Sequence, residues 1–446
     1  MKAILSIIFL WISLLVFGQN RFDFVQDKPS AVIPFRFVND LIVVKTKIND
    51  VPLNMIFDTG VKQTVLINLI NKDSLGLRQQ KQRYFSGVGN KNTKIGGIVS
   101  NNNILKIGDA MINRHATIYL IADFKFHFSE TMGVKINGFI GGEWIKDYIV
   151  KVDYKEKKLI FYKHKTFDNR KLRRYEAFDV DIVKDKPYIH MDVYWNSRKE
   201  KPVRAKFLID LGNNDAFWFF QNDSLQIPKG KKTINDYFGF GFSGEISGKR
   251  TKVRKVSLGK KKHFTNVYTA LPDTIFFRHI TDSYPFDGLV GNSVLKRFYI
   301  YLDYQNKKVY FRKYWRNYRQ QFLFNDSGIF LTYDGKIPLK VKTTINHFSG
   351  SEKPLSGHIN IEEEFIYRFE MFDRIIVHHI RKDSPADRSG LAEGDIILEI
   401  NGQDVYQYQL YELDEKFFYH RNKYLKFLVE RNGVRHEIKV YNTKQL

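Results

Sequence analysis

Two aspartates have the residue type and the spacing for acid–base hydrolysis. Asp58 lies in a segment that reads MIFDTG (residues 55–60), and Asp210 lies in one that reads FLIDLG (residues 207–212). Each aspartate therefore ends a short apolar run and begins a turn that contains a glycine. When two carboxyl groups meet at close range, one keeps its proton while the other ionises, so the pair can supply an acid and a base together.

The two aspartates occupy matching points of an internally duplicated segment. Asp58 and Asp210 lie 152 positions apart, and further pairs of motifs follow in the same order at nearly the same spacing. These pairs are Ser86–Gly89 with Phe238–Gly241, Leu105–Gly108 with Val256–Gly259, Gly138–Gly141 with Gly288–Gly291, and Val152–Leu159 with Leu302–Val309. A repeat of this length is a domain-sized unit and not a solenoid repeat. We therefore expect two lobes that bring one aspartate each to a pseudo-twofold axis.

The elements that must position the aspartates are short β-strands. Ile42–Ile48 and Leu53–Phe57 are rich in β-branched and aromatic residues and flank a turn at Asn49 and Asp50. Tyr188–Tyr194 and Val203–Ile209 repeat this pattern before Asp210. Helical periodicity is confined to short stretches, so the predicted fold is mostly β.

The chain also divides into segments of different character. Residues 1–19 combine a positive start, a short apolar run and a small residue, which is typical of a secretory signal peptide. We expect the two lobes at residues 31–162 and 176–312. A basic, aromatic connector then leads to a C-terminal domain at residues 325–446, with its core at 372–445.

Composition excludes several functional classes. The chain has 446 residues and no cysteine, which rules out disulfides, thiol catalysis and cysteine metal sites. The net charge of +24 would suit nucleic acid, but the basic residues are dispersed among loops, and export separates the protein from nucleic acid. No stretch after the signal peptide is apolar enough to cross a bilayer. The adjacent histidines His378 and His379 alternate across a strand, so we expect no metal site there.

The lobe motifs resemble the aspartic peptidases, in particular bacterial exported members with retropepsin-like lobes in a pepsin-like two-lobed chain. The segment around Asp58 is similar to the active-site signature of that family, and the apolar-apolar-glycine motifs that end at Gly141 and Gly291 are similar to the strand that runs beneath its catalytic loop. The resemblance covers roughly residues 31–312 in both halves. It implies that Asp58 and Asp210 are the catalytic pair.

The resemblance also assigns supporting roles to the neighbours of the pair. Gly60 and Gly212 permit the tight turns that present the aspartates, and Thr59 can hydrogen-bond across the lobe interface. Leu211 departs from the threonine or serine that is usual in the family, because leucine cannot make the reciprocal bond. Gly87 and Gly89 are candidates for a flap over the cleft.

The C-terminal segment resembles a PDZ domain, a small α+β fold. It contains Ser-Pro-Ala (384–386), Gly-Leu (390–391), Gly-Asp-Ile-Ile-Leu (394–398) and Ile-Asn-Gly (400–402). We expect a helix from Tyr406 to Tyr419 and a final hairpin that turns at Asn432 and Gly433. The upstream loop that would bind a peptide carboxylate is indistinct, with Leu355–Gly357 as a weak candidate.

Two functions therefore remain open. The first is an exported aspartic endopeptidase that needs no cofactor, acts on peptides or unfolded proteins in the periplasm, envelope or medium, and uses the PDZ domain to bind a peptide terminus or partner protein. The second is a weak or inactive relative, impaired by Leu211, that binds peptides or serves as an envelope scaffold.

Overall fold

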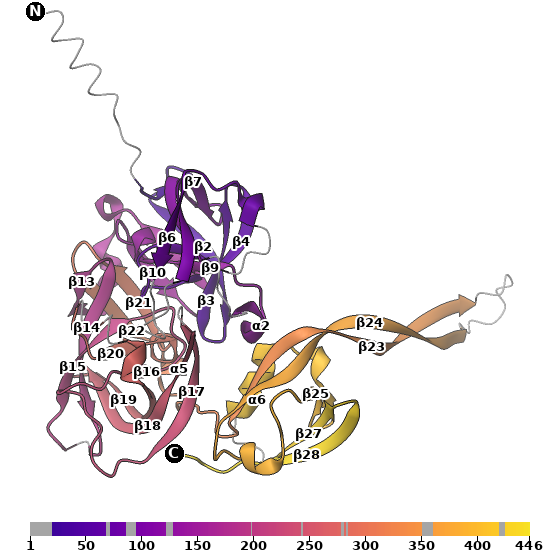
Figure 1. Cartoon of the computed structure of the whole chain (residues 1–446). Helices are drawn as coiled ribbons and strands as arrows, with labels where there is room; N and C mark the ends of the chain where they lie inside the picture. Colours follow the sequence, from indigo (N-terminus) through magenta and orange to yellow (C-terminus); the bar gives the residue numbers. More distant parts are fainter. Residues whose placement is uncertain are drawn as a thin grey trace, which may run out of the picture. The chain divides into compact units, whose positions relative to one another are not determined.

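The computed structural model of the chain describes residues 20–67, 72–85, 95–121, 128–197, 199–241, 244–277, 281, 284–349, 360–418 and 424–446. It divides into two compact units, Met1–Phe324 with Lys444–Leu446, and Asn325–Thr443 (Figure 1). The signal peptide expected at residues 1–19 lies outside the described residues. Among the helices that are described, none is long and apolar enough to span a bilayer.

The first lobe of the larger unit is built almost entirely of strands. In β2 buried side chains alternate with exposed ones, so that the odd-numbered residues from Ala31 to Phe35 are buried. Its elements are β1 (Asp23–Phe24), β2 (Ser30–Val38), β3 (Leu41–Ile48), β4 (Val51–Phe57), β5 (Thr64–Leu66), β6 (Gln80–Phe85), β7 (Ile95–Ile107), β8 (Met111–Ile121), α2 (Phe128–Met132), β9 (Gly138–Ile140), β10 (Ile149–Asp153) and β11 (Lys158–Tyr162), with 3₁₀ turns at Lys72–Leu75 and Gly142–Trp144.

The second lobe repeats these elements. They are β12 (Glu176–Asp179), β13 (Asp181–Val183), β14 (Lys186–Tyr194), β15 (Val203–Ile209), β16 (Phe217–Phe219), β17 (Thr233–Gly241), β18 (Gly244–Leu258), β19 (Lys262–Pro272), β20 (Gly288–Val290), α4 (Asn292–Leu295), β21 (Phe298–Asp303), β22 (Lys308–Lys313) and α5 (Trp315–Tyr318). Further 3₁₀ turns lie at His164–Thr166, Asn169–Leu172 and Thr274–Phe276.

The same strand topology recurs in both lobes around the aspartates. In the first lobe β4 pairs with β3 on one side and, in parallel, with β9 on the other, and β9 also pairs with β5. In the second lobe β15 pairs with β14 and, in parallel, with β20, and β20 also pairs with β16. Each aspartate thus leaves a strand that is held on both sides.

One sheet joins the two lobes. Its order β12-β22-β21-β10-β11-β2 places β10 and β21, the corresponding strands of the two lobes, next to each other and antiparallel. Val150 pairs with Leu302, Lys151 with Tyr301, and Val152 with Ile300. Each residue has a counterpart about 150 positions away in the other lobe. When every residue in these pairs is replaced by its counterpart, the same set of pairs results. The pseudo-twofold axis therefore passes close to the Lys151 and Tyr301 pair.

The larger of the apolar clusters among the described residues runs through both lobes. It includes Phe57 and Trp144 from the first lobe and Phe207 and Phe217 from the second, all essentially inaccessible to solvent. The rings of Phe57 and Trp144 meet edge to face at 5.1 Å, as do those of Phe207 and Phe217 at 5.5 Å. Phe57 and Phe207, buried in the strands that lead to Asp58 and Asp210, anchor those strands in the core.

The described part of the smaller unit is a six-stranded sheet with an α-helix of nine residues. Its elements are β23 (Ile329–Ser349), β24 (Asn360–Ile380), β25 (Ile396–Ile400), β26 (Gln403–Asp404), α6 (Leu410–Phe418), β27 (Tyr424–Arg431) and β28 (Val434–Tyr441), with 3₁₀ turns at Asp387–Ser389 and Val405–Gln407. The sheet order is β23-β24-β25-β27-β28. Its own core contains Leu331, Val377, Leu413 and Phe427.

The mostly β fold predicted from the sequence, with two duplicated lobes and an α+β PDZ domain, is confirmed. The final hairpin turns at Asn432 and Gly433, which both have positive φ, as predicted. The prediction of a helix from Tyr406 was wrong in its start, because a 3₁₀ turn at Val405–Gln407 precedes α6 and Tyr408 is extended. The residue limits expected for the lobes and for the C-terminal domain stay predictions.

One element was not anticipated from the sequence. β23 and β24 form a hairpin of 21 residues a strand, which Figure 1 shows extending beyond the compact part of its unit. Tyr367, Phe369 and Met371 project from one face of β24 and are more than half exposed. The carboxylate loop considered at Leu355–Gly357 lies outside the described residues.

Candidate active site

The two aspartates leave their strands in the same way. The backbone N–H of Asp58 donates to the carbonyl of Ile140, and that of Asp210 donates to the carbonyl of Val290, both at 3.0 Å. These carbonyls belong to the parallel strands β9 and β20. Each parallel strand therefore fixes the point at which the adjacent strand ends and the backbone turns to present the aspartate.

The two carboxyl groups meet at the pseudo-twofold axis. Asp58 and Asp210 hydrogen-bond to each other through their side chains. Both aspartates are only 8% exposed. A Cβ atom added to Gly60 would lie 3.0 Å from one carboxyl oxygen of each of them. The backbone N–H of Gly60 also donates to Asp58 Oδ1 at 2.6 Å, and that of Gly212 donates to Asp210 Oδ1 at 3.0 Å.

The two glycines allow this close approach. A Cβ atom on Gly212 would lie 2.2 Å from the carboxyl carbon of Asp58, a distance at which the two groups overlap. A Cβ on Gly60 would lie 3.0 Å from an oxygen of each aspartate, which is tight but less severe. The absence of a side chain at each position is thus what lets the opposite aspartate in.

Thr59 ties the two loops together across the lobe interface. Its hydroxyl donates to the carbonyl of Ile209 at 2.6 Å and accepts the backbone N–H of Leu211 at 3.0 Å. Thr59 is fully buried, so this pair of bonds is shielded from water. Leu211, also buried at 1% exposure, has no hydroxyl with which to return the bond.

Burial and mutual repulsion set the ionisation of the pair. Desolvation raises the pKa of Asp58 above its usual value, although hydrogen bonds from Asp210 and from the Gly60 backbone oppose the shift. The pKa of Asp210 is raised well above its usual value by desolvation and by the neighbouring charge of Asp58. The pair therefore keeps one proton between its two carboxyl groups to a higher pH than an isolated aspartate would. The titration belongs to the pair as a whole.

Sequence reasoning missed a cation beside the pair. Lys186 lies at the start of β14, and continuing the register of Tyr188 with Leu208 brings it opposite Asp210. Burial lowers the pKa of Lys186, while the charges of Asp58 and Asp210 act in the opposite direction. In the first lobe the corresponding position, opposite Asp58 in the register of β3 with β4, is Leu41. Aligning the two hairpins in the sequence would have revealed this difference.

The structure brings six of the eight predicted site residues into one place: Asp58, Thr59, Gly60, Asp210, Leu211 and Gly212. The proposed flap residues Gly87 and Gly89 lie outside the described residues. Within the described part of the chain, no group of three or more histidines and carboxylates could hold a metal ion. His379 instead contacts Glu393, with Nδ1 and Oε1 3.0 Å apart.

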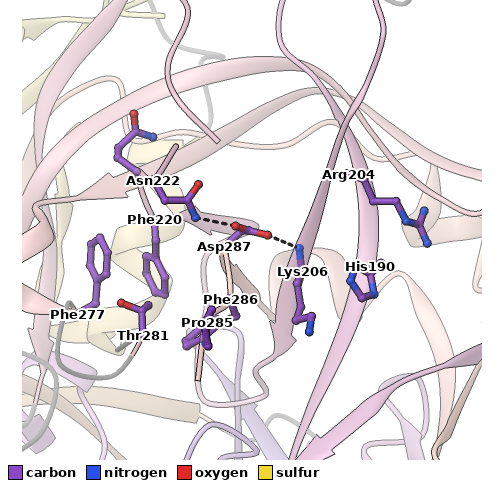
Figure 2. A pocket seen from close by; sticks show the side chains of 11 residues that line it. His190, Arg204, Lys206, Phe220, Asn222, Phe277, Thr281, Pro285, Phe286 and Asp287 are labelled. Carbon is purple, nitrogen blue, oxygen red and sulfur yellow. Dashed lines mark hydrogen bonds between the residues drawn. The ribbon is translucent and has the colours of Figure 1, made fainter. Parts of the chain in front are cut away.

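A separate pocket of about 480 Å³ lies in the second lobe (Figure 2). Its aromatic end includes Phe220 and Phe277, and its basic end includes Arg204 and Lys206. Both cations already have carboxylate partners: Arg204 lies 3.1 Å from Asp192, and Lys206 lies 3.0 Å from Asp181. None of the residues that line this pocket belongs to the aspartate loops, so the pocket is distinct from the candidate active site.

Comparison with known protein families gives a match in each of two regions of the chain. Residues 44–144, which include Asp58, match the family model for an aspartyl protease, and residues 376–415 match that for a PDZ domain. No curated protein matches the chain. The chain therefore carries an aspartyl protease domain in its first lobe and a PDZ domain near its C-terminus.

Proposed function

We propose that this protein is an aspartic-type endopeptidase that hydrolyses peptide bonds with water activated between Asp58 and Asp210. The observation that carries the proposal is the buried, hydrogen-bonded carboxyl pair contributed by two duplicated loops. The aspartyl protease match supports it for the first lobe, and the strand topology repeated around Asp210 extends the argument to the second.

In the proposed mechanism one carboxyl group of the pair is protonated and the other is ionised, and we assign the proton to Asp210. Ionised Asp58 takes a proton from a water molecule, whose oxygen attacks the carbonyl carbon of the scissile bond. Protonated Asp210 gives its proton to the carbonyl oxygen, so that a neutral tetrahedral diol forms. Asp58 then gives the proton that it took from water to the amide nitrogen, and the carbon–nitrogen bond breaks. One hydroxyl of the diol returns its proton to Asp210 as the new carboxylic acid forms, so the products are an acid, an amine and the singly protonated pair. No covalent intermediate and no cofactor are needed.

The test is hydrolysis of an unfolded protein from acidic to neutral pH by the wild type and by Asp58→Asn and Asp210→Asn. Each asparagine keeps the size of the side chain but cannot take part in the shared ionisation, so both variants should lose activity. The exposed Asp223→Asn variant is the matched control and should retain it. Equal activity in the wild type and both site variants would refute the proposal.

The alternative is a peptide-binding envelope scaffold without activity, and Leu211 is the observation that favours it. If the wild type binds peptides in the cleft yet cleaves none of them at any pH, and if Leu211→Thr changes neither property, the scaffold function replaces the peptidase. If Leu211 only slows a working enzyme, Leu211→Thr should raise the rate.

The PDZ domain would bind a peptide terminus or a partner strand by β-addition. Within the described residues, β23 forms one edge of the sheet, and α6 packs beside it with the Leu410 N–H donating to the Tyr333 hydroxyl at 3.2 Å. Removing residues 325–446 should weaken cleavage of long substrates more than of short ones. Equal effects on both would argue against a role in substrate capture.

We also propose export to the periplasm, the cell envelope or the medium. The positive start and the short apolar run within residues 1–19 support this proposal. Fractionation of cells, with determination of the N-terminus of the mature protein, tests this. An intact Met1 in the cytoplasmic fraction would contradict it.

A further inference from the structure

A buried hydrogen-bond chain crosses the lobe interface and ends on the peptide of Leu211. The hydroxyl of Tyr154, which follows β10 in the first lobe, donates to Asn292 Oδ1 at 2.6 Å. The side-chain amide of Asn292, at the start of α4 in the second lobe, donates to the carbonyl of Leu211 at 2.7 Å. Tyr154 is 7% exposed and Asn292 is fully buried.

The peptide groups around Leu211 are consequently held on both sides. Thr59 accepts the N–H of Leu211, and Asn292 binds its carbonyl. Both anchors reach the first lobe, directly through Thr59 and indirectly through Tyr154. Because Leu211 immediately follows Asp210, fixing these two groups also fixes the direction in which the Asp210 carboxyl leaves the chain.

Among the described residues, the pseudo-symmetric position has no such chain. Tyr304 is the counterpart of Tyr154, and its buried hydroxyl has no hydrogen-bond partner in that part of the structure. The counterpart of Asn292 is Gly142, where an added Cβ would lie 2.1 Å from the carbonyl oxygen of Asp185. The first loop therefore lacks the Tyr–Asn anchor but has the Thr59 hydroxyl, whereas the second has the anchor but lacks a hydroxyl.

We propose that Tyr154 and Asn292 are positioning residues that hold the Leu211 peptide, and with it Asp210, in place of the hydroxyl that residue 211 lacks. The inference rests on the proposed peptidase function. It explains how the pair can keep its geometry although only one of the two loops has a threonine.

The two tyrosines offer a matched pair of variants. Tyr154→Phe keeps the ring that packs edge to face on Phe35 and Phe37 but leaves Asn292 Oδ1 without its donor. Tyr304→Phe removes a buried hydroxyl that has no partner. We expect Tyr154→Phe to lower kcat by about 5- to 30-fold, the equivalent of one or two buried hydrogen bonds, with KM nearly unchanged. Tyr304→Phe should leave kcat and KM near the wild-type values.

A double-mutant cycle tests whether the anchor and a hydroxyl at position 211 are interchangeable. By the symmetry of the Thr59 bond to Ile209, a threonine at position 211 would donate to the carbonyl of Phe57. Asn292→Ala should therefore lower kcat strongly in the wild type but only weakly in a Leu211→Thr background. Equal losses in both backgrounds would show that Asn292 serves the fold and not the loop.

Amide hydrogen exchange separates failure of this inference from failure of the proposed function. Exchange at the Leu211 and Gly212 amides should be faster in Tyr154→Phe than in the wild type and unchanged in Tyr304→Phe. If the wild type shows no hydrolysis but this pattern holds, the peptidase function fails and the anchor stands. If the two tyrosine variants exchange and react alike, the anchor is refuted whether or not the wild type is active.

Discussion

The loops that carry Asp58 and Asp210 share a backbone but differ in what supports them. Both leave a strand held by a parallel neighbour, and both turn through a glycine that admits the opposite carboxyl group. The first loop contributes a threonine hydroxyl that reaches across the interface, while the second is held by side chains that lie outside it. The comparison teaches that a shared strand topology presents both aspartates, while different side chains hold the two loops in place.

The two loops also differ in charge. Lys186 stands opposite Asp210 in the second lobe, where the first lobe has the buried Leu41. Arg250, a buried residue of β18 in the second lobe, has Nε 2.5 Å from Asp236 and Nη1 2.9 Å from Asp215. The corresponding position of the first lobe, 151 residues earlier in the matching register of β7 with β8, is Val99.

The glycines should give the largest difference between the loops. Gly212→Ala forces a methyl group to within 2.2 Å of the Asp58 carboxyl carbon, and the resulting displacement should lower kcat/KM by about 100-fold or more. Gly60→Ala meets its neighbours at 3.0 Å and should cost less. Steady-state hydrolysis measures both. A larger loss in Gly60→Ala would contradict the described approach of the two loops.

Arg250 should account for the next largest effect. Arg250→Leu leaves Asp236, which is 6% exposed, beside an apolar side chain, and should lower the free energy of unfolding by about 3–5 kcal/mol. Chemical denaturation measures this loss. Ile98→Leu on β7, the corresponding strand of the first lobe, is the control, because a swap between apolar side chains of equal size should cost less than about 1.5 kcal/mol. Similar losses in both would mean that the ion pairs do not anchor the second lobe.

Lys186→Met should move the pH profile of kcat. The Lys186 cation lowers the pKa of both aspartates, so its removal raises both. The active form has one proton on the pair and exists between the two pKa values, so both limbs of the profile should shift to higher pH. Lys184→Met, at an exposed position on the preceding turn, should shift the limbs less. A shift to lower pH would contradict the assigned position of Lys186.

The smallest effect concerns stability. Because the folded-state pKa of Asp210 is raised, its contribution to stability is fully present below the unfolded pKa and is lost as the pH rises through the folded pKa. Asp210→Asn cannot ionise and should therefore lose less stability as the pH rises. The denaturation midpoint, followed from acidic to neutral pH, measures this. A midpoint that falls as steeply in the variant as in the wild type would show that Asp210 titrates normally.

The sequence predicted the strands that lead to the aspartates because they are short apolar runs, rich in β-branched and aromatic residues, that follow turns, and the duplication repeated this pattern. It did not predict the β23–β24 hairpin. Side chains on both faces of that ribbon are exposed, such as Lys336 and Arg368, so alternation is weak. The predicted start of α6 was wrong because the Asp404 side chain accepts the Tyr406 N–H and a 3₁₀ turn forms before the helix. Glu412, which accepts the Gln409 N–H, marks the true start.

The candidate site was predictable only in part. The aspartates and glycines stand in a motif that both halves carry, and Thr59 is adjacent to one of them. Tyr154, Asn292 and Lys186 are remote in sequence from the aspartates, and their roles depend on how the two lobes face each other. Their difference from Tyr304, Gly142 and Leu41 becomes visible only when the halves are aligned residue by residue.

The central claim is that the two aspartates share one proton. Carboxyl ¹³C chemical shifts of Asp58 and Asp210, followed through a pH titration of the folded protein, measure this directly. We predict that one carboxyl, Asp210, stays protonated far above the ordinary aspartate value of 3.8 while Asp58 is already ionised. Two independent titrations near that ordinary value would contradict the claim.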